Sequence, residues 1–116
     1  MTKFSEAVSN SEDWLKITDH ESSSESWLAA SPYFQTQISC RDWEKQFSQA
    51  RGPLGAVLSR TVDDAQGYTP PSDIPSGEYV IVTFVTNFEN KPGVIESVTN
   101  QKQPDGRWAV VGYFIK

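Results

Sequence analysis

The chain has 116 residues, a length that fits one domain, because two cores of half this size would each be marginally stable. Ten Lys and Arg against fifteen Asp and Glu give a formal net charge of −5 without any basic run, which argues against nucleic acid as a partner. No stretch approaches the roughly 20 apolar residues that cross a bilayer, so we expect no membrane partner.

Cysteine and histidine occur once each, as Cys40 and His20. A single cysteine forms no internal disulfide, and neither residue type supplies a metal centre alone, so we expect neither a metal nor a cofactor. We expect His20 to be exposed in a Ser- and Glu-rich turn, and Cys40 to be buried as a small apolar side chain. The N-terminal residues lack the apolar core of a signal peptide, which predicts a cytoplasmic protein; a mature exported form with an added Met is the alternative.

The first half of the chain has helical periodicity. Apolar or small residues recur every three or four positions from Lys3 to about Asp19, which predicts a partly amphipathic helix. The polar residues 20–26 interrupt this pattern. Residues 27–34 then predict a short second helix, followed by a turn or a further helical turn after Pro32.

The stretch "ISCRDW" predicts the start of another helix, with Ser39 as N-cap and Asp42 at the capping-box position. We expect this helix to end near Arg51, with Gly52 in the left-handed conformation just past the end. An anion-binding role for Arg51 and Gly52 is the alternative, but phosphate loops place their glycines before a helix rather than after one. At Gly55 we expect a close backbone approach or a bulge.

The second half of the chain is rich in β-branched and aromatic residues. We predict strands over residues 54–62, 78–89 and 94–102, and a last strand after the "PDG" turn at 104–106. Residues 63–77 contain three prolines and no periodicity, which predicts an irregular loop. The short turns between the last three strands favour an antiparallel meander.

This order predicts a single α+β domain over residues 1–116, with helices from about 3 to 51 packed on a curved four-stranded antiparallel sheet from about 54 to 116. Alternation gives the sheet two apolar faces. We expect the helices to cover the bulkier face, formed by Val80, Val82, Phe84, Thr86, Phe88, Trp108, Val110 and Phe114. The opposite face is expected to hold Tyr79, Ile81, Thr83, Val85, Val111, Tyr113 and Ile115.

Helices drawn from the first fifty residues can cover one face of such a sheet but hardly two. An apolar face left in water is typical of an interface. We therefore predict a homodimer packed through the sheet, with Ile81, Val85, Val111 and Ile115 at the interface.

Glu96 shares a strand face with two valines, and strand pairing places it on the core side of the sheet. A carboxylate there must be paired, hydrogen-bonded or protonated. We expect Arg60 to be its cation, and Tyr79 or Tyr113 to donate a hydroxyl. Two interpretations stay open: a ligand-binding pocket around a polarised acid, and a structural ion pair.

Short motifs follow one another in a distinctive order along nearly the whole chain. They are "WL" at 14–15 with Asp19, "SW" at 26–27, Trp43, "RGPLG" at 51–55, "SR" at 59–60, "GEYV" at 77–80, Phe84, "NFENK" at 87–91, "ES" at 96–97 with Val98, and "DGRWAVVGYFIK" at 105–116. This order resembles the bacterial domain-of-unknown-function family numbered 4019. The resemblance implies a small single-domain protein, from a family in which many members carry export signals and no activity is assigned.

The order of helices followed by a curved sheet is also similar to cystatin-like and nuclear-transport-factor-like cones, an analogy of fold that does not transfer function. Our leading hypothesis is a non-enzymatic binding or interaction module, dimerising through its sheet, with a small-molecule pocket between helices and sheet. One alternative is a small cone-fold enzyme that uses Glu96 as general acid or base. Another is a structural adaptor that binds a partner protein through the 63–77 loop, where Asp63, Asp64, Tyr68 and Asp73 are either ligand contacts or solvated residues.

Overall fold

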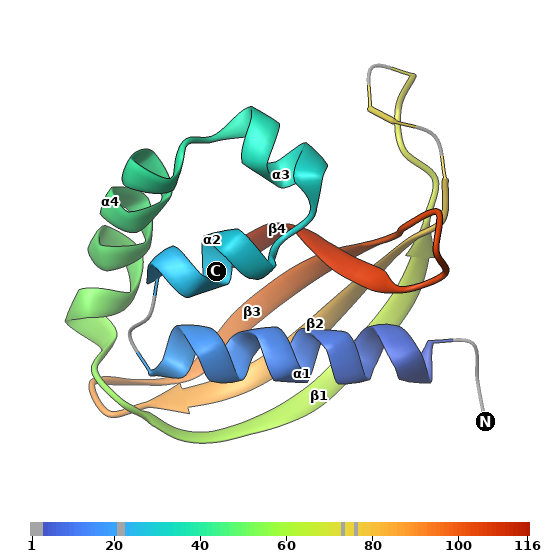
Figure 1. Cartoon of the computed structure of the whole chain (residues 1–116). Helices are drawn as coiled ribbons and strands as arrows, with labels where there is room; N and C mark the ends of the chain where they lie inside the picture. The colour runs from blue at the N-terminus through green and yellow to red at the C-terminus, as the bar shows by residue number, and fades with distance from the viewer. Residues whose placement is uncertain (1–3, 21–22, 73, 76) are drawn as a thin grey trace.

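The computed structural model describes residues 4–20, 23–72, 74–75 and 77–116. Its helices come first in the chain and its strands afterwards, which confirms the predicted α+β class (Figure 1). The four strands form one antiparallel sheet in the order β1-β2-β3-β4. The elements are α1 (Ser5–Asp19), α2 (Ser23–Ala29), α3 (Pro32–Gln37), α4 (Cys40–Arg51), the 3-10 helix η1 (Gly52–Leu54), β1 (Val57–Tyr68), β2 (Tyr79–Phe88), β3 (Lys91–Lys102) and β4 (Trp108–Ile115).

Side-chain caps set the starts of two helices. The Ser39 hydroxyl accepts a hydrogen bond from the backbone N–H of Asp42 at 3.1 Å, which confirms the predicted cap of α4. Ser31 caps α3 in the same way, and Pro32 occupies its first turn. The predicted interruption over residues 20–26 is too long, because α2 already begins at Ser23. No helix in the described ranges is both long and apolar enough to cross a membrane.

The joint between α4 and the sheet differs from the prediction. Gly52 has φ −52° and ψ −53°, so it continues the helical path into η1 and is not left-handed. The left-handed residue is Gly55, with φ 79° and ψ −156°. A Cβ at Gly55 would lie 2.7 Å from Glu89 Oε1 and 3.0 Å from Asn90 Nδ2, in the turn between β2 and β3. The expected close backbone approach at Gly55 is therefore confirmed.

Strand β1 is longer than predicted. It runs to Tyr68, which pairs with Tyr79 at the start of β2, and a register shift lies between Val62 and Asp64. Residues 63–68 of the predicted 63–77 loop are therefore strand, because pairing with the strongly β-forming β2 outweighs the weak propensity of these polar residues. Asp73 lies outside the described residues.

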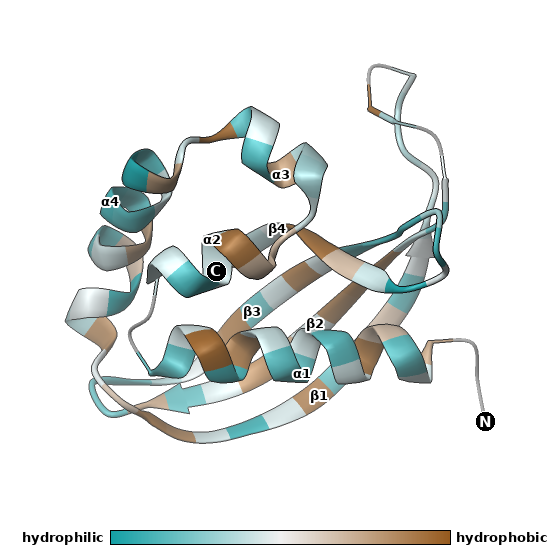
Figure 2. Cartoon of the chain, in the orientation of Figure 1, coloured by the Kyte–Doolittle hydropathy of each residue, from teal (hydrophilic) through white to brown (hydrophobic). Residues whose placement is uncertain are grey.

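All helices pack on one face of the sheet, and α1 runs across it (Figure 1). Figure 2 shows hydrophobic and hydrophilic residues along β3 as the strand passes behind α1. The covered face of β2 and β3 is buried throughout and consists of Val80, Val82, Phe84, Thr86, Phe88, Val94, Glu96, Val98 and Asn100. Against it pack the rings of Trp14, Phe34, Trp43, Phe47 and Tyr113, whose centroids lie 5.2–6.3 Å apart in the contacting pairs.

A bulge in β4 changes the predicted faces of this strand. Thr99 pairs with Gly112 and Asn100 with Val110, which leaves Val111 as the extra residue. Beyond the bulge Tyr113 and Ile115 lie opposite Val98 and Glu96 and face the helices, while Phe114 lies opposite Ser97 on the face turned away from the helices. The predictions for Tyr113, Phe114 and Ile115 were therefore wrong, because one inserted residue inverts the alternation after it.

Candidate functional site

Four charged side chains meet between the helices and the sheet. Asp19 ends α1, Arg51 ends α4, Arg60 lies in β1, and Glu96 lies in the middle of β3. We call these four residues the ion-pair cluster. Each comes from a different element, so the cluster ties both helices to both strands.

Glu96 is fully buried, with 0% of its surface exposed. Its Oε1 accepts hydrogen bonds from Arg60 Nε at 2.8 Å and from the Thr86 hydroxyl at 2.5 Å. Its Oε2 accepts a short hydrogen bond from the Tyr113 hydroxyl and lies 3.6 Å from Arg51 Nη1. Both carboxylate oxygens are thus engaged by protein groups.

Asp19 closes the other side of the cluster. Its Oδ2 accepts from Arg60 Nη1 at 2.7 Å, and its Oδ1 accepts from Arg60 Nη2 at 3.0 Å, a bidentate fork. Arg51 Nη2 donates to the same Oδ1 at 2.9 Å. The Arg60 guanidinium therefore bridges Asp19 and Glu96 with all of its nitrogens.

Arg51 is buried, with 9% of its surface exposed, and lies between aromatic rings. Its guanidinium carbon is 5.2 Å from the Phe47 ring centroid and 4.9 Å from that of Phe88. Its Nη1 donates to the Tyr113 hydroxyl and to the Thr18 hydroxyl, both at 3.3 Å. Its Nε is buried without a hydrogen-bond partner among the described residues.

The charges of the ion-pair cluster balance, because two guanidinium groups face two carboxylates. Burial favours a neutral Arg60, but its bonds with Asp19 and Glu96 outweigh this and raise its pKa. Burial and the neighbouring Glu96 charge raise the pKa of the Tyr113 phenol. The cluster is therefore a charge-neutral network in which both Glu96 oxygens are bonded, while Asp19 and Arg51 also line a surface pocket of about 970 Å³.

At acidic pH, protonation of Asp19 is expected to reduce the contribution of this network to the free energy of unfolding. Burial acts to raise the pKa of Asp19, but hydrogen bonds and charge from Arg60, then Arg51, outweigh it and lower that pKa below the usual 3.8. A lowered folded-state pKa adds stability above the unfolded pKa, and this stability is lost as pH falls through the folded pKa. We expect the difference in unfolding free energy between the wild type and Asp19→Asn to shrink below about pH 4. Urea unfolding over a pH series measures it, and a difference independent of pH would contradict this assignment.

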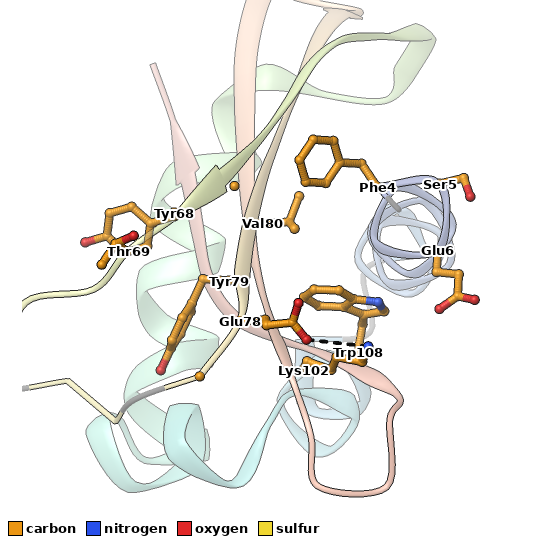
Figure 3. Close-up of a pocket in the computed structure, with 12 residues that line it drawn as sticks. Phe4, Ser5, Glu6, Tyr68, Thr69, Glu78, Tyr79, Val80, Lys102 and Trp108 are labelled. Carbon is orange, nitrogen blue, oxygen red and sulfur yellow. Dashed lines mark ion pairs between the residues drawn. The ribbon is translucent and has the colours of Figure 1, made fainter. Parts of the chain in front are cut away.

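A pocket of about 730 Å³ lies at the end of the sheet where β2 begins and β3 ends. On its helix side Phe4, Val80 and Trp108 form an apolar wall, and the Lys102–Glu78 ion pair, 3.5 Å between Nζ and Oε2, lies at its rim (Figure 3). Figure 3 shows Tyr68 and Tyr79 on the other side of the strands. The pocket therefore wraps around the end of the sheet beside α1 and lies away from Glu96.

The face of β2, β3 and β4 that turns away from the helices is the third candidate, and we call it the open face. Cross-strand pairs arrange it in rows, with Ile81–Thr99–Gly112, then Thr83–Ser97–Phe114, then Val85–Ile95. The side chains of Ile81, Val85 and Ile95 are half-buried, whereas Phe114 is 63% exposed. The open face thus combines an apolar patch with small hydroxyl side chains.

The structure brings together three of the four ligand-binding candidates. Glu96, Arg60 and Tyr113 are in direct contact, whereas the Tyr79 hydroxyl donates to the backbone oxygen of Pro75 at 2.5 Å. The prediction that Tyr79 could reach Glu96 was wrong. The cross-strand partner of Glu96 is Phe84, in the middle of β2, whereas Tyr79 is the first residue of β2 and lies on the opposite face of the sheet. Of the interface candidates, Ile81 and Val85 lie on the open face, Val111 is the half-buried bulge residue, and Ile115 faces the helices.

We did not predict from the sequence that Asp19 and Arg51 join Arg60 and Glu96 in one cluster. A signal for Arg51 exists in the sequence, because it continues the stripe of Trp43 and Phe47 at a spacing of four along α4. Asp19 likewise follows Leu15 by four positions on α1. A charged residue that extends an apolar stripe indicates a buried ion pair.

Of the remaining reactive residues, His20 directly follows Asp19 and lines the pocket beside Asp19 and Arg51, whereas Cys40 begins α4. His20 is exposed, as expected. Cys40 is half-buried rather than buried, and its pKa is raised by desolvation and by the Glu44 carboxylate, with its Sγ 3.6 Å from Glu44 Oε1. Within the described ranges no group of three or more His, Cys, Asp or Glu side chains is placed to hold a metal ion.

Comparison with known proteins identifies a family. A family model described as a protein of unknown function (DUF4019) matches residues 10–113. The match spans nearly the whole chain and confirms the resemblance in motif order. Neither the curated proteins nor the solved structures contain a match, so the cone-fold analogy stays a prediction.

Proposed function

We propose that this chain, which belongs to the DUF4019 family of proteins of unknown function, is a non-enzymatic interaction module that binds a partner through its open face. The observation that carries the proposal is the composition of that face. Strands β2 and β4 contain no charged residue, and the one charged side chain in the middle of β3, Glu96, faces the helices. In a chain of which 22% is charged, three adjacent strands with an uncharged face are a departure from an ordinary solvated surface.

This composition is the one that interface cores have. Their compositional signal is depletion of charged residues and enrichment of aromatic ones, whereas bulk hydrophobicity does not distinguish them. Phe114, 63% exposed, is the aromatic residue of the patch. Phenylalanine is among the aromatic residues enriched at interfaces, so Phe114 is the candidate anchor of this face.

The ion-pair cluster supports the same proposal, because its buried carboxylate, Glu96, is fully engaged by protein groups. A general acid or base must reach a substrate proton directly or through one water, and Glu96 is fully buried with both oxygens bonded. The cluster instead holds α1 and α4 on the sheet. Its role is to keep the sheet rigid, so that the open face is presented in a fixed shape.

Site-specific photocrosslinking tests the proposal. A photoreactive residue at Thr83 or Thr99 on the open face is expected to give a crosslinked adduct in cells that produce the protein naturally. The same residue at Lys45, on the exposed side of α4, is the control and is expected to give none. Equal crosslinking at all three positions, or none at Thr83 and Thr99, would contradict an interface on the open face.

A second candidate function is small-molecule binding at the sheet-end pocket. Its volume of about 730 Å³ falls within the roughly 300–1,000 Å³ of ligand sites, and apolar walls with a few charged groups at the rim are usual in such sites. The adaptor hypothesis relied on an irregular loop over residues 63–77. This loop is shorter than predicted, because β1 continues to Tyr68.

The pocket and the open face can be tested separately. Small aromatic compounds that raise the melting temperature of the wild type are expected to lose this effect in Trp108→Ala and to keep it in Phe114→Lys. Stabilisation that survives in Trp108→Ala would place the compounds elsewhere and remove the support for this second function.

A further inference from the structure

We infer that the partner on the open face is a second copy of this chain, packed sheet against sheet. This inference rests on the proposed function and names its partner. Three features of the described residues carry it. The open face is uncharged, the β1 edge is protected against strand pairing, and the Phe114 ring is complementary in shape to the region around Gly112 on a second copy.

Charge favours a second copy, packed through this face, over a strongly charged partner. The chain has a formal net charge of −5, so two copies repel each other wherever their charged surfaces meet. On β2, β3 and β4 two copies can meet with little repulsion, because the rows of the open face carry Ile, Val, Thr, Ser, Gly and Phe side chains. The nearest charges are on β1, where Asp64 pairs with Thr83 and Asp63 Oδ2 lies 3.5 Å from the Thr83 hydroxyl. A strongly charged partner would instead select a face with complementary charge.

The edge strand β1 favours stacking of faces over pairing of edges. Asp63 and Asp64 lie exposed in the middle of β1, beside the register shift after Val62. Charged side chains and bulges on an edge strand are common devices against edge-to-edge pairing. The other edge strand, β4, has a bulge at Val111, and its Val110 carbonyl accepts a hydrogen bond from the Ser31 N–H at 2.8 Å, so pairing at that edge is hindered too. A second copy therefore meets the sheet through the uncharged rows of β2, β3 and β4.

Phe114 and its neighbours are self-complementary. The ring lies on β4 next to Gly112, which has no side chain, and across from the small Ser97. Facing sheets in sandwiches lie about 10 Å apart with interdigitating side chains. Across a two-fold axis, the Phe114 ring of each copy would fill the shallow region around Gly112, Ser97 and Thr99 of the other, with Ile81, Val85 and Ile95 packed at the centre.

Sedimentation equilibrium of the full chain over about a 100-fold concentration range tests the inference. We expect a monomer–dimer equilibrium reaching twice the chain mass of 13.0 kDa. Phe114→Lys and Val85→Lys are each expected to raise the dimer dissociation constant at least about tenfold. Leu28→Lys is the matched control, because Leu28 on α2 is 67% exposed, close to the value for Phe114, and lies away from the open face. Its dissociation constant is expected to equal that of the wild type.

Two results would overturn the inference: a monomer mass throughout the concentration range, or a dimer that both open-face variants leave intact. The concentration series on the wild type requires no substitution, so it shows whether the chain dimerises even if a variant fails to fold. The photocrosslinked adduct separates the two proposals. An adduct of other than twice the chain mass refutes the second copy and keeps the interaction module, whereas a monomer mass without any adduct refutes both.

Discussion

Replacing Glu96 with glutamine is expected to lower the free energy of unfolding by about 3–5 kcal/mol, because it breaks a buried ion pair from one side. The amide removes the negative charge that faces Arg60 and Arg51. It also places an N–H₂ donor among groups that are themselves donors, namely the Thr86 and Tyr113 hydroxyls and the Arg60 guanidinium. Asp19 alone would then have to balance two buried cations.

Urea unfolding followed by circular dichroism measures this loss. Glu12→Gln is the control, because Glu12 lies exposed on α1 and is expected to change the free energy by less than about 0.5 kcal/mol. If Glu96→Gln were as stable as the wild type or more stable, the carboxylate would be a strained group rather than a structural one, and a catalytic role for Glu96 would regain support.

Replacing Gly55 with alanine is expected to cost about 2–3 kcal/mol, because its φ of 79° and ψ of −156° lie in a region that only glycine adopts without strain. In addition, the new Cβ would approach Glu89 Cβ and Asn90 Nδ2 to 3.0 Å, so the turn between β2 and β3 would have to move. Both costs arise in the folded state.

Gly52→Ala is the matched control for Gly55→Ala, three residues away in the same joint. Gly52 has φ −52°, and a Cβ added there would meet no heavy atom within 4 Å, so alanine should be neutral or stabilise by up to about 1 kcal/mol. Thermal unfolding of both variants compares them directly. Equal losses at both positions would contradict the assignment of the left-handed residue to Gly55.

The pairing of Glu96 with Arg60 could be predicted from the sequence, because a carboxylate between two valines on a buried strand face needs a partner and few cations lie on the strands. The meander of the last three strands and the N-cap at Ser39 were predictable for similar local reasons. Each of these features follows from neighbours in the sequence or from a simple turn between adjacent strands.

The contributions of Asp19 and Arg51 could not be derived in the same way. These residues lie at the ends of two helices, 32 positions apart in the chain, and only the packing of α1 and α4 on the sheet brings them within 2.9 Å. Their position on apolar stripes indicates burial, but not which charge they meet.

Which β4 side chains lie on the open face could not be predicted, because a single inserted residue, Val111, shifts the register of β4. Nothing in the pattern of β4 marks Val111 as a bulge, since "WAVVGYFI" alternates equally well in either register. The bulge turned Tyr113 toward the cluster and Phe114 toward solvent. The same limit applied to the joint, where the choice between Gly52 and Gly55 depended on the distant turn at Glu89 and Asn90.

The central claim is that the uncharged open face joins two copies of the chain, and the most direct test is the thermal unfolding midpoint as a function of protein concentration. When unfolding includes dissociation, the midpoint rises with concentration. We expect this rise for the wild type, and for Phe114→Lys a rise that begins only at concentrations at least about tenfold higher. A wild-type midpoint that stays the same at every concentration would contradict the claim.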